Sequence, residues 1–111
     1  MSAPHDLTAV LQLDRVIHEP ARLLILSILA GAASAEFGFV EELSGLNKGN
    51  LSSHLSKLEA AGLVEIKKSF RGKRPLTTLR LTTNGRKSLA AYRQRLAGVV
   101  AGIPLTNPKD T

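Results

Sequence analysis

The sequence predicts a mainly α-helical fold with one small β-hairpin, an α+β domain of 111 residues. Apolar residues recur at spacings of three and four through most of the chain, which is the period of an amphipathic helix. Between residues 63 and 82 apolar and polar residues alternate instead, on both sides of "RGKRP", as in two strands joined by a turn. A chain of this length builds one hydrophobic core, so we expect a single domain over residues 1–103 and a flexible tail over residues 104–111.

The composition excludes several classes of protein. There is no cysteine, which rules out disulfide and thiolate chemistry and favours a reducing cytoplasm. The longest apolar run, residues 23–35, is too short and too rich in Ser and Ala to cross a bilayer. The N-terminus lacks the basic segment and apolar core of a signal peptide. We therefore expect a cytoplasmic, nucleoid-associated protein without a membrane partner.

The positive charge is concentrated in one part of the chain. The formal net charge is +6, yet residues 1–61 carry four Lys and Arg against seven acidic residues. Residues 62–95 carry ten Lys and Arg against Glu65 alone. This asymmetry is typical of a face that binds a polyanion, and it is equally compatible with a solvated surface that maintains solubility. Charge alone leaves both interpretations open.

Two helices are predicted in the N-terminal third. The first begins after the N-cap Asp6 and runs to about Ile17, and it is apolar on more than one face, so a partner subunit is a candidate to cover it. The second has Pro20 at its first position and ends at Gly31. It is the expected central core helix, with inward residues Leu23, Leu24, Leu26, Ile28 and Leu29.

A short extended piece at Phe37 and two closely spaced helices follow. In residues 38–46 we expect Val40 and Leu43 to face inward, Glu41 and Glu42 to face outward, and Gly45 to close the helix. In residues 47–61, Asn47 is the expected N-cap and Gly62 follows the last turn. The buried stripe of this second helix consists of Leu51, Leu55 and Leu58.

The face opposite that stripe carries small neutral polar groups and lysine. Because serine and asparagine are poor helix formers, ordinary solvent-facing positions favour Glu, Lys and Arg. A front of small polar groups instead lets the helix approach another surface closely and meet base edges in a DNA major groove. His54 lies between this front and the stripe, where it contacts a phosphate or packs at a helix–helix boundary. The candidate DNA-binding residues of this helix are Lys48, Asn50, Ser52, Ser53, His54 and Lys57.

The hairpin that follows has an apolar face and a basic tip. The inward residues are expected to be Val64, Ile66, Phe70, Leu79 and Leu81. Gly72 allows a narrow turn that fits a groove, so the tip residues Arg71, Lys73 and Arg74 are candidates for minor-groove or phosphate contact. Further candidates for phosphate contact are Lys67, Lys68, Arg80, Arg86 and Lys87.

Thr82 is the expected N-cap of a last helix over residues 83–103. Apolar residues in this helix follow the 3-4-3-4 spacing of a coiled-coil seam. We expect the first and last helices to form a homodimer interface, with contact residues Leu7, Val10, Leu11, Leu89, Tyr92, Leu96, Val99 and Ile103.

The run "GNLSSHLSKLEAAGLVEIKKSFRGKRPLTTLRLTTNGR", together with "IHEPARLLIL", resembles winged helix-turn-helix transcription regulators of the MarR/ArsR type. The closest likeness is to their small stand-alone "winged helix DNA-binding domain" members, and it covers Leu13 to Leu96. The resemblance implies homodimers that act as repressors or activators. It also implies that the helix at residues 47–61 enters the major groove of double-stranded DNA, while the tip at residues 71–74 reaches the adjacent minor groove or its phosphates.

Other functions find less support in the sequence. Asp14 and His18 are four residues apart, and such isolated pairs are far more often surface hydrogen-bonding groups than metal ligands. No nucleophile setting or phosphate-binding glycine loop is present, so we expect no enzyme, no cofactor and no metal. No small-molecule effector is indicated. Two alternatives stay open: a winged-helix interaction module that docks an acidic protein, and a non-specific, nucleoid-associated architectural DNA-binding protein.

Overall fold

The computed structural model describes residues 7–106, so Asp6 and the end of the predicted tail lie outside the described residues. It confirms the mainly helical fold with a small antiparallel sheet. In chain order the elements are a 3₁₀ helix η1 (Leu7–Gln12), α1 (Pro20–Ala30), β1 (Ala35–Glu36), α2 (Phe37–Ser44), α3 (Lys48–Ala60), β2 (Val64–Arg71), β3 (Arg74–Leu81) and α4 (Thr83–Gly102). The strand order is β1-β3-β2, and the short β1 adds a third strand beside the expected hairpin.

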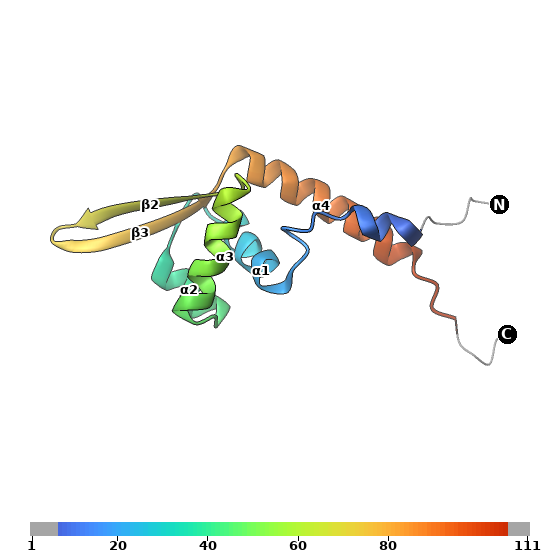
Figure 1. Ribbon diagram of the computed structural model, residues 1–111, viewed down its shortest axis with the longest axis horizontal. Helices are drawn as coiled ribbons and strands as arrows, with labels where there is room; N and C mark the ends of the chain where they lie inside the picture. The colour runs from blue at the N-terminus through green and yellow to red at the C-terminus, as the bar shows by residue number, and fades with distance from the viewer. Residues whose placement is uncertain (1–6, 107–111) are drawn as a thin grey trace.

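The molecule is elongated, with extents of 67 × 28 × 21 Å. A helical body of α1, α2 and α3 occupies the middle (Figure 1). The hairpin of β2 and β3, called the wing below, projects from one end of this body. At the other end α4 projects with η1 packed against it (Figure 1). The two projections give the chain two surfaces that its own core does not cover.

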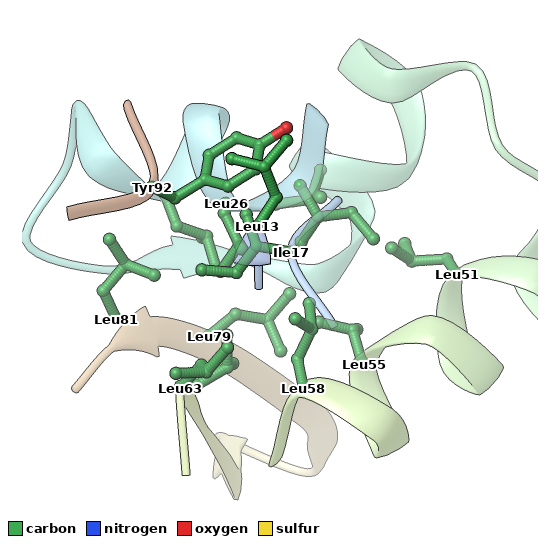
Figure 2. Packing of buried hydrophobic residues seen from close by; sticks show 14 residues of the cluster. Leu13, Ile17, Leu26, Leu51, Leu55, Leu58, Leu63, Leu79, Leu81 and Tyr92 are labelled. Carbon is green, nitrogen blue, oxygen red and sulfur yellow. The ribbon is translucent and has the colours of Figure 1, made fainter. Parts of the chain in front are cut away.

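One hydrophobic core joins α1, α3, the base of the wing and the middle of α4 (Figure 2). The leucine stripe of α3 is completely buried or nearly so, as the sequence predicts. Leu79 and Leu81 supply the sheet side of the core, also as predicted. The buried hydrophobic residues are Leu13, Ile17, Ile25, Leu26, Leu29, Val40, Leu51, Leu55, Leu58, Leu63, Val64, Leu79, Leu81 and Tyr92.

The prediction of a continuous first helix up to Ile17 is wrong. Only η1 is helical there, and irregular turns connect it to α1. The Asp14 carboxylate accepts hydrogen bonds from the backbone amides of Val16 and Ile17, at 2.9 and 3.2 Å. An aspartate that bonds to amides two and three residues ahead competes with the helical pattern and ends it. The turn still places Ile17 in the core.

Two predicted core residues of α2 and α1 are exposed instead. The covered stripe of α2 runs through Phe37, Val40 and Ser44, so Leu43 lies off it and is 60% exposed. Glu41, expected outward, is partly covered for the same reason. Leu24 lies on the outer side of α1.

Phe70 is also exposed, by 72%, although its position in the strand alternation places it on the inward face. The alternation is correct, since Val64 is buried and Ile66 partly so. The outer part of the wing, however, projects past the helices of the body (Figure 1). Phe70 is one pair before the end of the hairpin, and its ring is left uncovered. Period-two patterning identifies a face of a strand but does not say how far the core extends beneath it.

The turn of the wing is shorter than the five residues of "RGKRP". Arg71 pairs with Arg74 in the strand register, which leaves Gly72 and Lys73 as a two-residue loop. Gly72 has φ +64° and Lys73 has no positive φ, the pattern of a type II′ turn. That turn matches the twist of antiparallel strands and requires glycine at its first central position. Arg71, Arg74 and Pro75 therefore belong to the strands.

The start of α4 is locked onto the turn that follows α3. Thr82 caps α4 as predicted, since its hydroxyl oxygen accepts a hydrogen bond from the Gly85 amide at 2.8 Å. The same hydroxyl donates to the Gly62 carbonyl at 2.6 Å, and the Thr82 amide donates to the Leu63 carbonyl at 3.1 Å. Gly85 lies against this backbone so closely that a β carbon there would overlap the Leu63 carbonyl group.

A second polar junction joins α1 to α3. Glu19 is the N-cap of α1, and its carboxylate accepts hydrogen bonds from the amides of Ala21 and Arg22 at 3.0 and 2.9 Å. Nδ1 of His54 lies 3.5 Å from this carboxylate and 3.3 Å from Nη1 of Arg22. Burial by itself raises the pKa of Glu19, but the two amide bonds and the charges of His54 and Arg22 outweigh it and lower the pKa overall.

We expect Gly85→Ala to destabilise the protein by about 2 kcal/mol or more, because the Leu63 backbone cannot move aside as a flexible side chain would. The free energy of unfolding in urea measures this loss. Gly98→Ala in the same helix is the control, since nothing lies within 4 Å of the position that its β carbon would take. This control gains up to about 1 kcal/mol from helix propensity. Equal stability of the two variants would contradict the tight contact at Gly85.

We expect Glu19→Gln to destabilise the protein by about 0.5 kcal/mol near neutral pH, because a charged cap interacts favourably with the helix N-terminus. Since the folded state lowers the pKa of Glu19, its stabilisation is complete above the ordinary value of 4.5. It is lost as pH falls through the lower folded pKa, so wild type and variant converge in acid. Urea unfolding between pH 3 and pH 7 measures the difference, with the exposed Glu42→Gln as control. A difference that grows in acid would contradict this assignment.

Candidate nucleic-acid interface

The outer face of α3 is small and polar. The side chain of Asn47 accepts a hydrogen bond from the Asn50 amide at 2.8 Å and so sets the start of the helix. Burial of the leucine stripe then turns the opposite side to solvent. The exposed residues of this face are Lys48, Gly49, Asn50, Ser52, Ser53, Ser56 and Lys57. Every predicted α3 contact except His54 lies on it.

A groove of about 510 Å³ separates α3 from the wing. Lys48, Ser52 and Ser56 line it on the α3 side, and Lys68 and Thr77 line it on the wing side. The groove brings cations of two predicted sets together, although 20 positions separate Lys48 from Lys68 in the chain. Ser56 and Thr77 are not among the predicted contacts. Helical periodicity already places Ser56 on the small polar front, one turn after Ser52, so the sequence locates this residue although it is not a predicted contact.

The two faces of the wing differ in chemistry. The strand register pairs Lys68 with Thr77 and Phe70 with Pro75, on the face that continues from Ile66 toward the groove. The alternate residues lie on the other face, where the cross-strand pair of Arg71 and Arg74 is nearest the tip. One face is thus apolar at its end, and the other is cationic.

Two wing arginines already have acidic partners. Arg71 Nη2 lies 2.5 Å from the Glu36 carboxylate of β1. Arg80 and Glu65 face each other across the strands and form two hydrogen bonds of 2.9 Å. The hydrogen bond and charge of Arg80 lower the pKa of Glu65, and those of Glu65 raise the pKa of Arg80. Arg71 and Arg80 are therefore less available to a phosphate than the predicted cations that have no acidic partner among the described residues.

The remaining predicted cations divide into exposed and structural groups. Lys67, Lys68, Lys73, Arg74 and Lys87 are exposed and form no ion pair within residues 7–106. Arg86, in contrast, donates hydrogen bonds to the carbonyls of Ala30 and Ala32, at 3.3 and 3.1 Å. An arginine at the C-terminal end of a helix satisfies carbonyls that lack helical partners.

His54 and the Asp14–His18 pair also have protein partners. His54 lies at the junction of α3 with Glu19 and Arg22, on the side of α3 that faces α1. His18 contacts the Tyr92 hydroxyl through Nδ1, at 2.7 Å, while Asp14 bonds to backbone amides. Burial raises the pKa of Tyr92. Residues 7–106 hold no group of three metal-ligating side chains.

The predicted dimer residues lie in two environments. Tyr92 is in the core of its own chain, and Leu89 and Leu96 pack partly against that core. Leu7, Val10 and Leu11 of η1 are exposed, as is Ile103 just beyond α4, while Val99 is half-buried. Val100 and Leu105, which are not among the predicted contacts, add to this exposed apolar surface. Within the described residues, no helix is both long enough and apolar enough to cross a membrane.

Comparison with known proteins agrees with this arrangement. A family model described as the winged helix DNA-binding domain matches residues 21–100. An uncharacterized protein of Methanocaldococcus jannaschii is 37% identical over 78 residues, which are 70% of this chain and 85% of that protein. A transcriptional regulator homologue from Pyrococcus horikoshii OT3 has a similar structure, with a TM-score of 0.80 and 28% identity over 89% of this chain and 98% of that one.

Two further structures extend the comparison. The transcriptional repressor CouR, solved on a 23-mer DNA duplex, matches with a TM-score of 0.68 and 25% identity over 85% of this chain and 64% of its own. A putative MarR-family regulator from Porphyromonas gingivalis W83 shares the fold, with a TM-score of 0.62 and 19% identity over 80% of this chain and 86% of its own. The predicted resemblance is confirmed: the chain belongs to the winged helix DNA-binding domain family, a family of DNA-binding transcriptional regulators and not a class of enzymes.

Proposed function

We propose that the protein is a sequence-specific regulator that binds double-stranded DNA as a homodimer, with α3 in the major groove and the wing on the neighbouring minor groove. The observation that supports this most is the groove itself. It places the small polar face of α3, with Lys48, beside Lys68 of the wing, on a surface that suits a negatively charged, grooved ligand.

The face of α3 suits the reading of base edges. Asn50 is exposed in the first turn, and an asparagine side chain can form two hydrogen bonds to adenine in the major groove. Ser52 and Ser53 are short enough to let the helix approach closely, and a hydroxyl can bond to several bases. These side chains are the proposed source of sequence preference.

The lysines of the groove suit the phosphate backbone between the two DNA grooves. Lys48 and Lys68 line opposite sides of the groove, so one DNA strand can lie between them. Lys67, Lys73 and Arg74 add exposed charge along the wing. Contacts of this kind fix the position of the protein without reading sequence. The relative that was solved on a DNA duplex supports this role for the fold.

The exposed apolar surface of η1 and the end of α4 suits a second copy of the chain. Leu7, Leu11 and Val100 are more than half exposed, and Ile103 is close to that value. In a dimer built there, two copies of α3 would meet successive major grooves about 34 Å apart. A DNA ligand places the protein at the nucleoid, in the cytoplasm.

Selection from random duplexes followed by sequencing tests the sequence preference. We expect wild type to enrich one pseudo-palindromic motif, and Asn50→Ala to relax the preference at one position of each half-site, at a cost of about 1–3 kcal/mol against the original base. Glu42→Gln on α2 is the control and should return the wild-type motif. Tight binding without any enriched motif would favour the architectural alternative. If the protein binds no duplex but retains an acidic protein partner, the interaction module would be favoured.

Sedimentation at micromolar concentration tests the homodimer. We expect wild type to sediment as a dimer and Leu11→Asp to sediment as a folded monomer, because a buried unpaired charge is costly. Leu43→Asp is the matched control, since Leu43 is similarly exposed but lies on α2. A monomeric wild type would contradict the arrangement on two half-sites.

A further inference from the structure

The aromatic ring of Phe70 lies outside the hydrophobic core, and a purely ionic wing has no use for it. It is 72% exposed, and only Leu105 is more exposed among the large hydrophobic side chains of the described residues. Five cations of the wing lie within four positions of it, namely Lys67, Lys68, Arg71, Lys73 and Arg74. An apolar ring in so basic a setting suits a ligand that has both phosphates and apolar surface.

The backbone holds this ring in a defined place. Every pair of residues from Val64 and Leu81 to Arg71 and Arg74 is in register, and a two-residue turn closes the hairpin. Phe70 lies directly across from Pro75, one pair before the turn. Phenylalanine and proline thus form a compact apolar pair close to the tip.

The pair lies on the same side of the wing as α3. Residues of one strand alternate between faces, so Phe70 shares its face with Lys68 and Ile66, both of which line the groove. Pro75 lines the groove as well. Arg71 and Arg74 are on the other face, and Arg71 bonds to Glu36 of β1. A wing in a minor groove would therefore present its apolar pair on the side of α3 and Arg74 on the opposite side.

We propose that Phe70, supported by Pro75, is an apolar wedge that enters the minor groove and partly unstacks one base step, so that the bound DNA bends. This inference rests on the proposed function. Phenylalanine and proline are among the side chains that open base steps from the minor groove. Flexible pyrimidine–purine steps deform most easily, so the wedge gives specificity for such a step without a hydrogen bond to any base.

The wedge and the cations of the wing differ in their dependence on salt. A cation that neutralises a phosphate releases counterions, so its loss lowers the slope of log affinity against log salt by about 0.9. Phe70 carries no charge, so its loss leaves the slope unchanged. Affinity and slope together thus separate the two kinds of contact.

The experiment uses the full chain and a duplex of about 25–30 base pairs taken from the selection, labelled at both ends. Fluorescence anisotropy over the range from about 50 to 200 mM salt gives affinity and slope, and energy transfer between the ends gives the bend. We expect Phe70→Ala to bind roughly tenfold more weakly with an unchanged slope and a smaller bend. Arg74→Ala should reduce the slope of log affinity against log salt and leave the DNA bend unchanged. Phe70→Trp, which keeps an aromatic ring, should retain both affinity and bend.

Several results would overturn the wedge. A Phe70→Ala variant that keeps the wild-type affinity and DNA bend would exclude the wedge. A Phe70→Ala variant whose affinity depends less on salt than that of the wild type would also exclude it. Thermal unfolding checks that each variant is folded, and Phe70→Leu replaces Phe70→Ala if the latter is not. Replacement of the flexible step by a stiff A-tract in the duplex should lower the affinity of the wild type more than it lowers the affinity of the Phe70→Ala variant. An equal loss of affinity in both proteins would contradict the proposal. If wild type binds no duplex at all, the proposed function itself fails.

Discussion

Burial of the leucine stripe of α3 governs how the other elements of the molecule are arranged. Leu51, Leu55 and Leu58 are within 2% of complete burial, and each contributes about 2 kcal/mol of hydrophobic free energy. Because the stripe must face α1 and the sheet, the opposite side of α3 must face solvent. The stability of the core and the orientation of the candidate DNA-reading face are thus one property of a single helix.

The same core determines where the two uncovered surfaces begin. Its hydrophobic residues extend along the wing only as far as Ile66 and Leu79, so the outer half of the hairpin stands free. At the other end, Tyr92 is the last buried residue of α4, and the remaining turns extend beyond the body with η1. A small core with two projections leaves a short chain two separate surfaces, one for the proposed DNA contact and one for the proposed dimer.

The cations of the basic segment do not share one role. Arg86 donates to carbonyls at the end of α1, and Arg80 is held by Glu65, whereas the groove lysines and Arg74 have no acidic partner among the described residues. An exposed ion pair contributes little to stability, but it reduces the charge that a phosphate meets. The charge that the wing can offer to a phosphate is therefore smaller than a count of its Lys and Arg residues indicates.

The order of amino acids was enough to predict the main element types, the leucine stripe, the caps at Asn47 and Thr82, the tight turn at Gly72 and the family. These features depend on local spacing and backbone preference, which a single chain displays directly. Only the folded molecule revealed the end of the first helix at Gln12, the exposure of Leu43 and Phe70, and the partners of Arg80, Arg86 and His54. Each of these features depends on which residues from distant parts of the chain pack next to one another. Periodicity and composition do not record how far a core extends, or which carboxylate or carbonyl accepts a hydrogen bond from a given cation.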